Sequence, residues 1–318
     1  MKYKILWVDD RKDEFEELDY PSSLKNYIAD LYFEPFVDFF ESVEEAKVAI
    51  KGTKYDVIFS DYNIGMADRG DDFIAYVRAQ NVNTEILFYS ALENVPKLNL
   101  DRISFFNIPK PNGHPKLLEK MKSLIDLTIE KLTDLQIIRG IVMTEVSELD
   151  NLMERVIIKF FMDPNGNPYP QREHIFNELM DKFDDDYKNN LKTPDLKCSK
   201  RCSHKIRIRP ITDIVGSLFF ESYKKARTIS KILEIVEAGH NNFLNDYKSE
   251  IIDIRNLLAH CESQMINGRE VLVTKRGEKR VFNSEEFIVI RHNILKYNKL
   301  FRTLEGELPL FAIRHPTK

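Results

Sequence analysis

Carboxylate, hydroxyl and ammonium side chains follow the short apolar runs in the first 125 residues. Asp9 and Asp10 follow KILWV, Asp61 follows DVIFS, Ser90 ends EILFYS, and Lys110 comes shortly after ISFFN. If these runs are parallel strands of one sheet, their carboxyl ends share one edge and the five side chains converge there. Converging carboxylates repel one another, and a divalent cation that prefers oxygen ligands, above all Mg²⁺, relieves this repulsion.

Such a group of residues can carry out phosphoryl transfer. An aspartate beside Mg²⁺ and a lysine can attack a phosphoryl donor, because the metal and the ammonium neutralise charge on the transferred oxygens. In that arrangement Asp61 is the nucleophile, and Ser90 can hydrogen-bond the bound phosphoryl group. Lys110 supplies the ammonium.

The pattern around these residues predicts the elements that position them. Five apolar runs, in KILWV, PFVDFF, DVIFS, EILFYS and ISFFNI, are short enough to be strands, and several are nearly continuous in apolar residues. Helical patterns such as VEEAKVAI and GDDFIAYVRAQ separate them. The expected fold of this part is therefore a doubly wound α/β domain with a parallel five-stranded sheet.

Over about residues 3–127 the sequence resembles the receiver domain of two-component response regulators. Asp9 and Asp10 match the acidic pair that binds the metal, and Asp61 matches the phosphorylated aspartate. Asn63 matches the position whose backbone carbonyl ligates the metal. The resemblance implies a phosphoprotein with a Mg²⁺ site formed by Asp9, Asp10, Asp61 and Asn63, and a sensor histidine kinase as partner.

The same resemblance assigns the switch residues. Ser90 with Ala91 matches the Ser/Thr-Ala switch, and Lys110 with the following proline matches the Lys-Pro pair. The family's switch aromatic lies three residues before the lysine, where this chain has Asn107. Phe105 or Phe106 is the candidate substitute for that aromatic.

After Pro115 the pattern becomes helical, which predicts a second, mostly α-helical domain with a small β-hairpin. We place the receiver domain at 1–127 and the helical output domain at 128–318. Helical periodicity runs for over 40 residues from Lys116, as a receiver helix that continues or turns into the output domain. Further helices are expected at about 172–190, 211–238, 242–262 and 284–305. A hairpin is expected in REVLVTKRGEKRVF.

EIIDIRNLLAHCES holds the residues of the second domain that could carry chemistry. Asn256 and His260 share a helix face, and Arg255 lies beside it, on an otherwise apolar helix. Polar groups on such a helix are costly to bury without partners. An imidazole can move the proton of a ribose hydroxyl near neutral pH, and a guanidinium can hold the scissile phosphate.

Arg255, Asn256 and His260 resemble the Arg-x4–6-His motif of the HEPN superfamily of all-helical domains. Many members are metal-independent ribonucleases that work as dimers, and others are catalytically silent modules. The resemblance implies a HEPN-like output domain, a homodimer that acts on RNA as an endoribonuclease with these three catalytic residues. The alternatives are a non-enzymatic module for dimerisation, protein binding or RNA binding, and a polar helix face that only packs on its neighbours.

A basic run near residue 200 is a second candidate RNA-binding feature. It contains no acidic residue, which favours phosphate binding, although a solvated basic loop is an equal alternative. Its basic residues are Lys197, Lys200, Arg201, Lys205, Arg207 and Arg209. Cys198, Cys202 and His204 could be metal ligands, but a fourth partner for zinc is missing from the pattern.

Composition restricts the class of protein. A hydrophobic content of 43%, a charged content of 31% and a net charge of −4 are typical of a soluble globular chain rather than a generally basic nucleic-acid binder. Three cysteines do not form a disulfide framework. The sequence shows no signal-peptide pattern and no apolar run long enough for a membrane span, so we expect a cytoplasmic protein.

Overall fold

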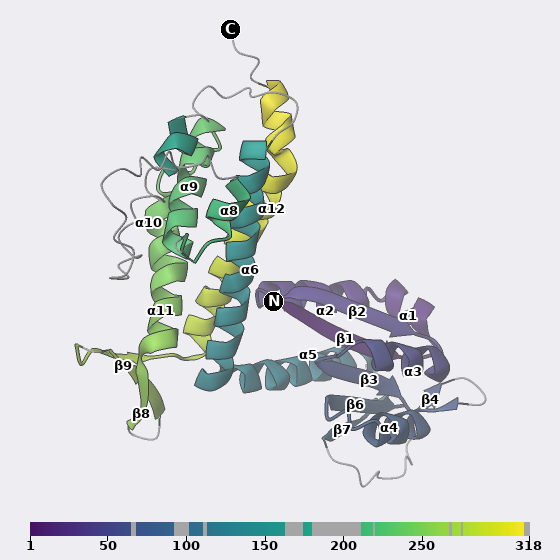
Figure 1. Cartoon of the computed structure of the whole chain (residues 1–318). Helices are drawn as coiled ribbons and strands as arrows, with labels where there is room; N and C mark the ends of the chain where they lie inside the picture. Colours follow the sequence, from purple (N-terminus) through teal and green to yellow (C-terminus); the bar gives the residue numbers. More distant parts are fainter. Residues whose placement is uncertain are drawn as a thin grey trace, which may run out of the picture. The chain divides into compact units, whose positions relative to one another are not determined.

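The computed structural model shows two compact units, Met1–Ile138 with Asn283–Arg291, and Arg139–Phe282 with His292–Lys318. Figure 1 labels the helices and strands of both units. The structure describes residues 1–64, 68–91, 102–110, 113–162, 174–179, 211–218, 220–266, 269–274 and 276–314.

A five-stranded parallel sheet forms the centre of the first unit. Its strands are β1 (Lys2–Val8), β2 (Glu34–Phe40), β3 (Val57–Asp61), β6 (Glu85–Ser90) and β7 (Ile103–Asn107). They lie in the order β2-β1-β3-β6-β7, and all neighbours pair in parallel. The predicted doubly wound α/β architecture is confirmed. All five carboxyl ends consequently lie at one edge of the sheet.

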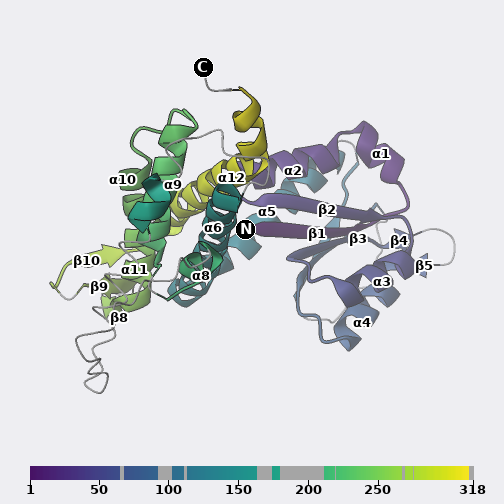
Figure 2. The same ribbon diagram turned by 45° about the horizontal axis from the view of Figure 1, so that its top comes forward.

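Helices cover both faces of this sheet, as Figure 2 shows. α1 (Lys12–Glu17), α2 (Tyr20–Asp30) and α5 (Gly113–Glu130) pack on one face, and α3 (Val43–Gly52) and α4 (Gly70–Ala79) pack on the other. Alternate residues of each central strand therefore enter two separate cores, which explains their nearly continuous apolar runs.

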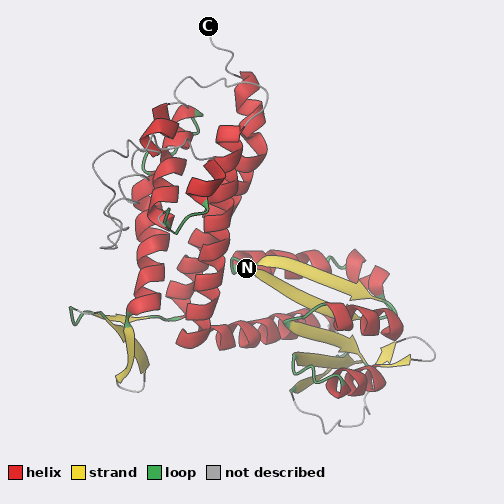
Figure 3. Ribbon diagram, in the orientation of Figure 1, coloured by secondary structure: helices red, strands yellow, loops and turns green. Residues whose placement is uncertain are grey.

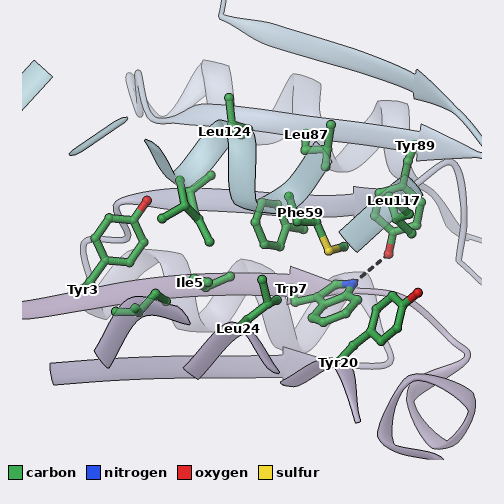
Figure 4. Close-up of a cluster of buried hydrophobic side chains, with 14 of the residues drawn as sticks. Tyr3, Ile5, Trp7, Tyr20, Leu24, Phe59, Leu87, Tyr89, Leu117 and Leu124 are labelled. Atoms are coloured by element: carbon green, nitrogen blue, oxygen red, sulfur yellow. Dashed lines mark hydrogen bonds between the residues drawn. The ribbon is translucent and has the colours of Figure 1, made fainter. Parts of the chain in front are cut away.

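The core beneath α1, α2 and α5 is rich in aromatic side chains. It contains Trp7, Phe15, Phe59 and Tyr89 among its buried residues, and several of them are drawn in Figure 4. The Trp7 ring stacks on Phe39 with centroids 4.5 Å apart. Large rings with few rotatable bonds make this side of the sheet a rigid support for the strand ends.

A short antiparallel pair follows β3. β4 (Asn63–Ile64) pairs with β5 (Asp68–Arg69), and α4 begins directly afterwards at Gly70. The Gly70 amide donates to the Tyr62 carbonyl at 2.9 Å. A Cβ on Gly70 would lie 2.0 Å from the Asp61 carbonyl oxygen, so this position requires glycine because of the close approach of the backbone.

The second unit is mostly helical. Its helices are α6 (Leu135–Met162, from Arg139 on), α8 (Ile211–Val215), α9 (Ser222–Ile235), α10 (Phe243–Tyr247), the π-helical turn η2 (Lys248–Ile252), α11 (Asp253–His260) and α12 (Ser284–Arg314, from His292 on). Phe243, Tyr247, Tyr297 and Phe301 form an aromatic cluster in its core, where the Tyr247 and Tyr297 centroids lie 4.8 Å apart.

The helix boundaries differ from the sequence expectations: α12 runs to Arg314 instead of about residue 305, and two expected helices are interrupted. The helix expected from Lys116 onward is interrupted by η1 (Lys131–Thr133) and by Asp134, whose backbone is extended at ψ 133°. The Asp134 carboxylate accepts a hydrogen bond from the Gln136 amide at 2.9 Å and so caps α6. The helix expected at 211–238 is divided after α8, where Gly216 lowers helix propensity.

Further along the chain, residues 174–179 are helical, and the rest of the helix expected at 172–190 lies outside the described residues. Helical backbone continues from α10 through the π turn to His260, close to the expected 242–262. The amide of Glu286 donates to the Asn283 side chain at 2.8 Å, which caps the start of α12.

A small antiparallel sheet follows α11, as Figure 3 shows. Its strands are β8 (Glu262–Ile266), β9 (Arg269–Val273) and β10 (Lys279–Val281), in the order β10-β9-β8. The region expected to form a two-stranded hairpin thus belongs to a three-stranded sheet, because Glu262–Ile266 also pairs with β9. In the described ranges, no helix has the length and apolar character that crossing a membrane requires.

Candidate metal centre

Three aspartates meet at the carboxyl edge of the parallel sheet. Asp9 and Asp10 follow the end of β1, and Asp61 is the last residue of β3. One carboxylate oxygen from each of these residues lies within 4.8 Å of the others. Asp9 and Asp61 are buried at 0% and 5% exposure, and Asp10 is exposed. The pocket therefore has two buried carboxylates and one that faces solvent.

The Asp9 carboxylate is held from two sides. Tyr89 Oη donates to its Oδ2 at 2.6 Å, and the Arg11 backbone amide donates to its Oδ1 at 2.9 Å. The Arg11 guanidinium Nε is 3.3 Å from the same Oδ1. Burial raises the pKa of Asp9, and the Arg11 charge and these hydrogen bonds oppose that rise.

Asp61 is the more strongly perturbed acid. Burial, followed by the negative charge of Asp9, raises its pKa to about 7. Arg11 opposes this rise, with Nη2 4.0 Å from Asp61 Oδ2, and so do hydrogen bonds from the backbone amides of Tyr62 and Asn63. These amides also restrict the orientation of the Asp61 carboxylate.

The donor set fits a hard divalent cation. Two buried carboxylates within reach of each other and of a third are electrostatically costly without added positive charge, and oxygen ligands of this kind suit Mg²⁺. Asp9, Asp10 and Asp61 would hold the ion. Asn63, whose carbonyl the sequence analysis assigns as a further ligand, is exposed directly beyond this strand end.

Ser90 and Lys110 differ in their environments. Ser90 ends β6, is 1% exposed, and accepts a hydrogen bond at its carbonyl from the Ile108 amide at 2.7 Å. Lys110 lies three residues beyond β7 and is exposed. The basic side chain found beside Asp61 in the described part of the chain is Arg11, which the sequence analysis did not identify. The only available signal was its position directly after the acidic pair.

The three residues near the end of β7 divide between solvent and core. Asn107 is exposed, and Phe105 is 46% exposed with its ring centroid 6.0 Å from that of Phe88. Phe106 is half-buried against the core beneath α5. Phe105 is therefore the aromatic side chain at this strand end that is accessible to a partner.

The motif residues of the helical unit point in different directions. Asn256 and His260 are exposed on α11, one turn apart. Arg255 is half-buried, and its Nη2 donates to Ser222 Oγ of α9 at 3.1 Å. Arg255 thus points to a neighbouring helix, while the imidazole and the amide face solvent.

Arg255 belongs to a polar cluster that the sequence analysis missed. Ser222 Oγ donates to Asp150 Oδ2 of α6 at 2.5 Å. Lys225, one turn after Ser222, forms an ion pair with Glu154 at 2.6 Å. Burial raises the pKa of Asp150, against the effects of the Ser222 hydrogen bond and of the Lys225 and Arg255 charges. The cluster links three helices, α6, α9 and α11, through charged hydrogen bonds.

The predicted basic run and the possible zinc ligands lie outside the described residues. This applies to Lys197, Lys200, Arg201, Lys205, Arg207 and Arg209, and also to Cys198, Cys202 and His204. Cys261, which follows α11, is a free cysteine, and its carbonyl accepts a hydrogen bond from Arg139 Nη2 at 2.7 Å.

Comparison with known proteins places similarity in the first unit. No protein-family model and no curated protein matches the sequence. Solved structures of response-regulator receiver domains align with the N-terminal two fifths of the chain. The Francisella response regulator 1452 receiver domain is 22% identical, with 40% of this chain and 99% of that chain covered and a TM-score of 0.31.

Two further solved structures have similar values. The response regulator TrrA of Thermotoga maritima, determined in complex with Mg²⁺-BeF, is 23% identical over 39% of this chain and 99% of that chain, with a TM-score of 0.31. Vibrio cholerae CheY4 is 22% identical over 39% and 98%, with a TM-score of 0.30.

Proposed function

We propose that the first unit is the receiver domain of a response regulator and accepts a phosphoryl group on Asp61 from a sensor histidine kinase. The observation that carries this proposal is the convergence of Asp9, Asp10 and Asp61, whose carboxylate oxygens lie within 4.8 Å of one another at the carboxyl edge of the sheet. Two buried carboxylates beside each other destabilise a fold by mutual repulsion. Such a pair therefore indicates a functional site rather than a purely structural one.

Each residue of the pocket has a separate role in phosphoryl transfer. A carboxylate oxygen of Asp61 attacks phosphorus, and the bond from phosphorus to the donor's nitrogen or oxygen breaks, with its electron pair leaving on the donor. The amides of Tyr62 and Asn63 hold the Asp61 carboxylate in one orientation during attack. Mg²⁺, when bound, neutralises charge on the transferred oxygens. Ser90 and Lys110 then bind the phosphoryl group.

Acetyl phosphate with Mg²⁺ tests the phosphoacceptor. The wild-type chain should gain the mass of one phosphoryl group, and Asp61→Asn should gain none. Asp56→Asn is the matched control, because Asp56 lies just before the amino end of β3 and accepts a hydrogen bond from the Lys4 amide at 2.7 Å. Phosphorylation of Asp61→Asn at the wild-type level would refute the assignment.

We also propose that phosphorylation controls a HEPN-like second unit that acts on RNA as a metal-independent endoribonuclease. The observation that favours it is the exposure of His260 and Asn256 one turn apart at the end of α11. An exposed imidazole can remove the proton of a ribose 2′-hydroxyl. Arg255 beside it would contact the phosphate, and two copies of the chain would form one composite site.

The bond from Arg255 to Ser222 favours the alternative, a non-enzymatic unit for dimerisation, protein binding or RNA binding. An arginine engaged with Ser222, which itself bonds Asp150, has fewer donors available for phosphate. The two proposals differ in what His260 does. In the non-enzymatic unit, His260 is a surface residue that takes no part in RNA cleavage.

Incubation of total cellular RNA with phosphorylated and unphosphorylated chain separates them. His260→Ala should lower cleavage by about 10²–10⁴-fold, as expected for loss of an acid–base group. His240→Ala, another exposed histidine of the same unit, is the matched control. Cleavage should persist in EDTA. If neither form of the wild type cleaves, the non-enzymatic unit is correct. Normal cleavage by His260→Ala would refute the catalytic role assigned to His260.

A further inference from the structure

Two consecutive hydrogen bonds connect the chain's single tryptophan to the metal centre. Trp7 Nε1 donates to Tyr89 Oη at 2.7 Å, a bond drawn in Figure 4, and Tyr89 Oη lies 2.6 Å from Asp9 Oδ2. Trp7, Tyr89 and Asp9 are each 0% exposed. Solvent therefore does not compete for either bond, and each keeps more of its strength than it would at the surface.

The chemistry of the three groups determines the direction of both bonds. An indole N–H only donates and an ionised carboxylate only accepts. The Tyr89 hydroxyl must therefore accept from Trp7 and donate its own hydrogen to Asp9. A hydroxyl that already accepts a hydrogen bond is a better donor, so the tryptophan strengthens the bond to Asp9.

The supporting residues hold these two rings in place. Tyr89 pairs with Asp61 across the β3–β6 register, so its backbone is tied to the strand that carries the second buried carboxylate. Trp7 stacks on Phe39 at 4.5 Å and is 4.8 Å from the Phe15 centroid. The hydroxyl is therefore fixed in space relative to both Asp9 and Asp61 before any ligand binds.

We propose that Tyr89 is a positioning residue of the metal centre. Its hydroxyl fixes the Asp9 carboxylate for Mg²⁺, and through it the binding of Mg²⁺ to that carboxylate changes the environment of Trp7. The inference rests on the proposed function, which requires Mg²⁺ at this pocket. The short bond to Oδ2 of Asp9 comes from Tyr89 at 2.6 Å, with Arg11 Nη2 farther away at 3.5 Å, and Oδ1 faces the Arg11 amide and Nε. Without the hydroxyl, the Asp9 carboxylate keeps the Arg11 contacts, which draw it toward that cation.

Tyr89→Phe is the direct test, because it removes one hydroxyl and keeps the buried ring. In the full-length chain, Mg²⁺ affinity measured by calorimetric titration should fall about 10-fold, as found when groups that orient metal ligands are removed. Tyr3→Phe is the matched control. Tyr3 is 1% exposed on the same strand as Trp7, but its hydroxyl bonds Thr128, so this variant should bind Mg²⁺ like wild type.

Trp7 fluorescence supplies a readout that does not depend on activity. In wild type, Trp7 emission should change with Mg²⁺ and have the same midpoint as the calorimetric heat. In Tyr89→Phe the heat should persist at higher Mg²⁺ while the emission no longer follows it. In Trp7→Phe, which keeps the bond from Tyr89 to Asp9, the Mg²⁺ affinity should lie within about threefold of wild type.

Three results would overturn the inference. The first is Mg²⁺ affinity of Tyr89→Phe within about twofold of wild type with the emission response retained. The second is an equal loss of affinity in Trp7→Phe, which would assign the effect to core packing. The third needs no variant: wild-type emission that does not change while Mg²⁺ binds. Absence of both Mg²⁺ binding and phosphorylation in wild type would instead refute the proposed function.

Discussion

Arg11 Nη2 lies 4.0 Å from Asp61 Oδ2, and the same guanidinium contacts Asp9. A positive side chain therefore occupies the space between two carboxylates that we assign to Mg²⁺. The guanidinium stabilises the metal-free pocket and opposes the approach of a cation. Arg11 is partly exposed, with 33% of its side chain accessible, so water screens much of this interaction.

Arg11→Gln should tighten Mg²⁺ binding. Removal of one partly screened charge is worth about 1 kcal/mol, or about fivefold in affinity. Lys12→Gln is the matched control, because Lys12 is adjacent and pairs with Glu16 at 4.0 Å rather than with the pocket. Calorimetric titration with Mg²⁺ compares the three proteins. Equal or weaker binding by Arg11→Gln would show that Arg11 supports the metal site.

The raised pKa of Asp61 predicts a specific pH dependence in the absence of metal. The folded chain keeps the Asp61 proton up to a pKa of about 7, whereas the unfolded chain loses it near a pKa of about 3.9. Between these values the folded state binds more protons, so the free energy of unfolding contributed by Asp61 falls as pH rises from about 4 to 7.

Urea unfolding in EDTA across this pH range measures the effect. Wild type should lose stability relative to Asp61→Asn as pH rises. In a parallel series with saturating Mg²⁺ in place of EDTA, most of this loss should be restored. Asp61→Asn should be the more stable protein at pH 8 in EDTA, since it removes a buried charge. A difference in the free energy of unfolding between the two proteins that stays constant with pH would contradict a raised pKa of Asp61.

Gly70→Ala should displace the end of β3 that carries Asp61. The new methyl group would lie 2.0 Å from the Asp61 carbonyl oxygen and 2.7 Å from the Phe88 ring, so the strand end or α4 must shift. We expect a loss of about 1–3 kcal/mol in the free energy of unfolding, typical of overpacking, together with weaker Mg²⁺ binding. Gly52→Ala is the control, because no atom lies within 4 Å of its added Cβ.

Ser222→Ala tests the polar cluster of the helical unit. The hydroxyl joins Asp150 to Arg255, so its loss leaves both with an unmet hydrogen bond and should cost about 1–3 kcal/mol of stability. Ser230→Ala on the same helix is the control, since its contact with Glu234 is long, at 3.5 Å, and exposed. Denaturant unfolding decides. Equal stability of the two variants would show that the cluster contributes nothing.

The sequence was sufficient to predict the parts of the pocket that depend on strand ends. Asp9 and Asp61 each follow an apolar run, and parallel pairing brings such positions together whatever the details of packing. The roles of Tyr89 and Trp7 could not be predicted, because the nearly continuous apolar runs that identify the strands also contain these two residues. In nearly continuous apolar runs, a tyrosine or a tryptophan is not distinguishable from other buried rings, and their hydrogen bond spans 82 residues.

In the helical unit, too, local features could be predicted from the sequence and contacts between distant residues could not. Local periodicity placed Asn256 and His260 on one face of α11, where the structure also has them. The contact of Arg255 with Ser222 could not be read from the motif, because the two residues are 33 positions apart. The break between α5 and α6 consists of the short helix η1 and of Asp134, whose carboxylate caps α6, and helical periodicity alone does not predict either feature.

The central claim is that Asp61 carries the phosphoryl group, and chemical trapping of that residue tests it most directly. Borohydride reduces an aspartyl phosphate to homoserine, which peptide mass spectrometry locates in the sequence. After incubation with acetyl phosphate and Mg²⁺, wild type should contain homoserine at position 61, and EDTA should abolish it. Homoserine at another aspartate, or its absence from phosphorylated protein, would contradict the account.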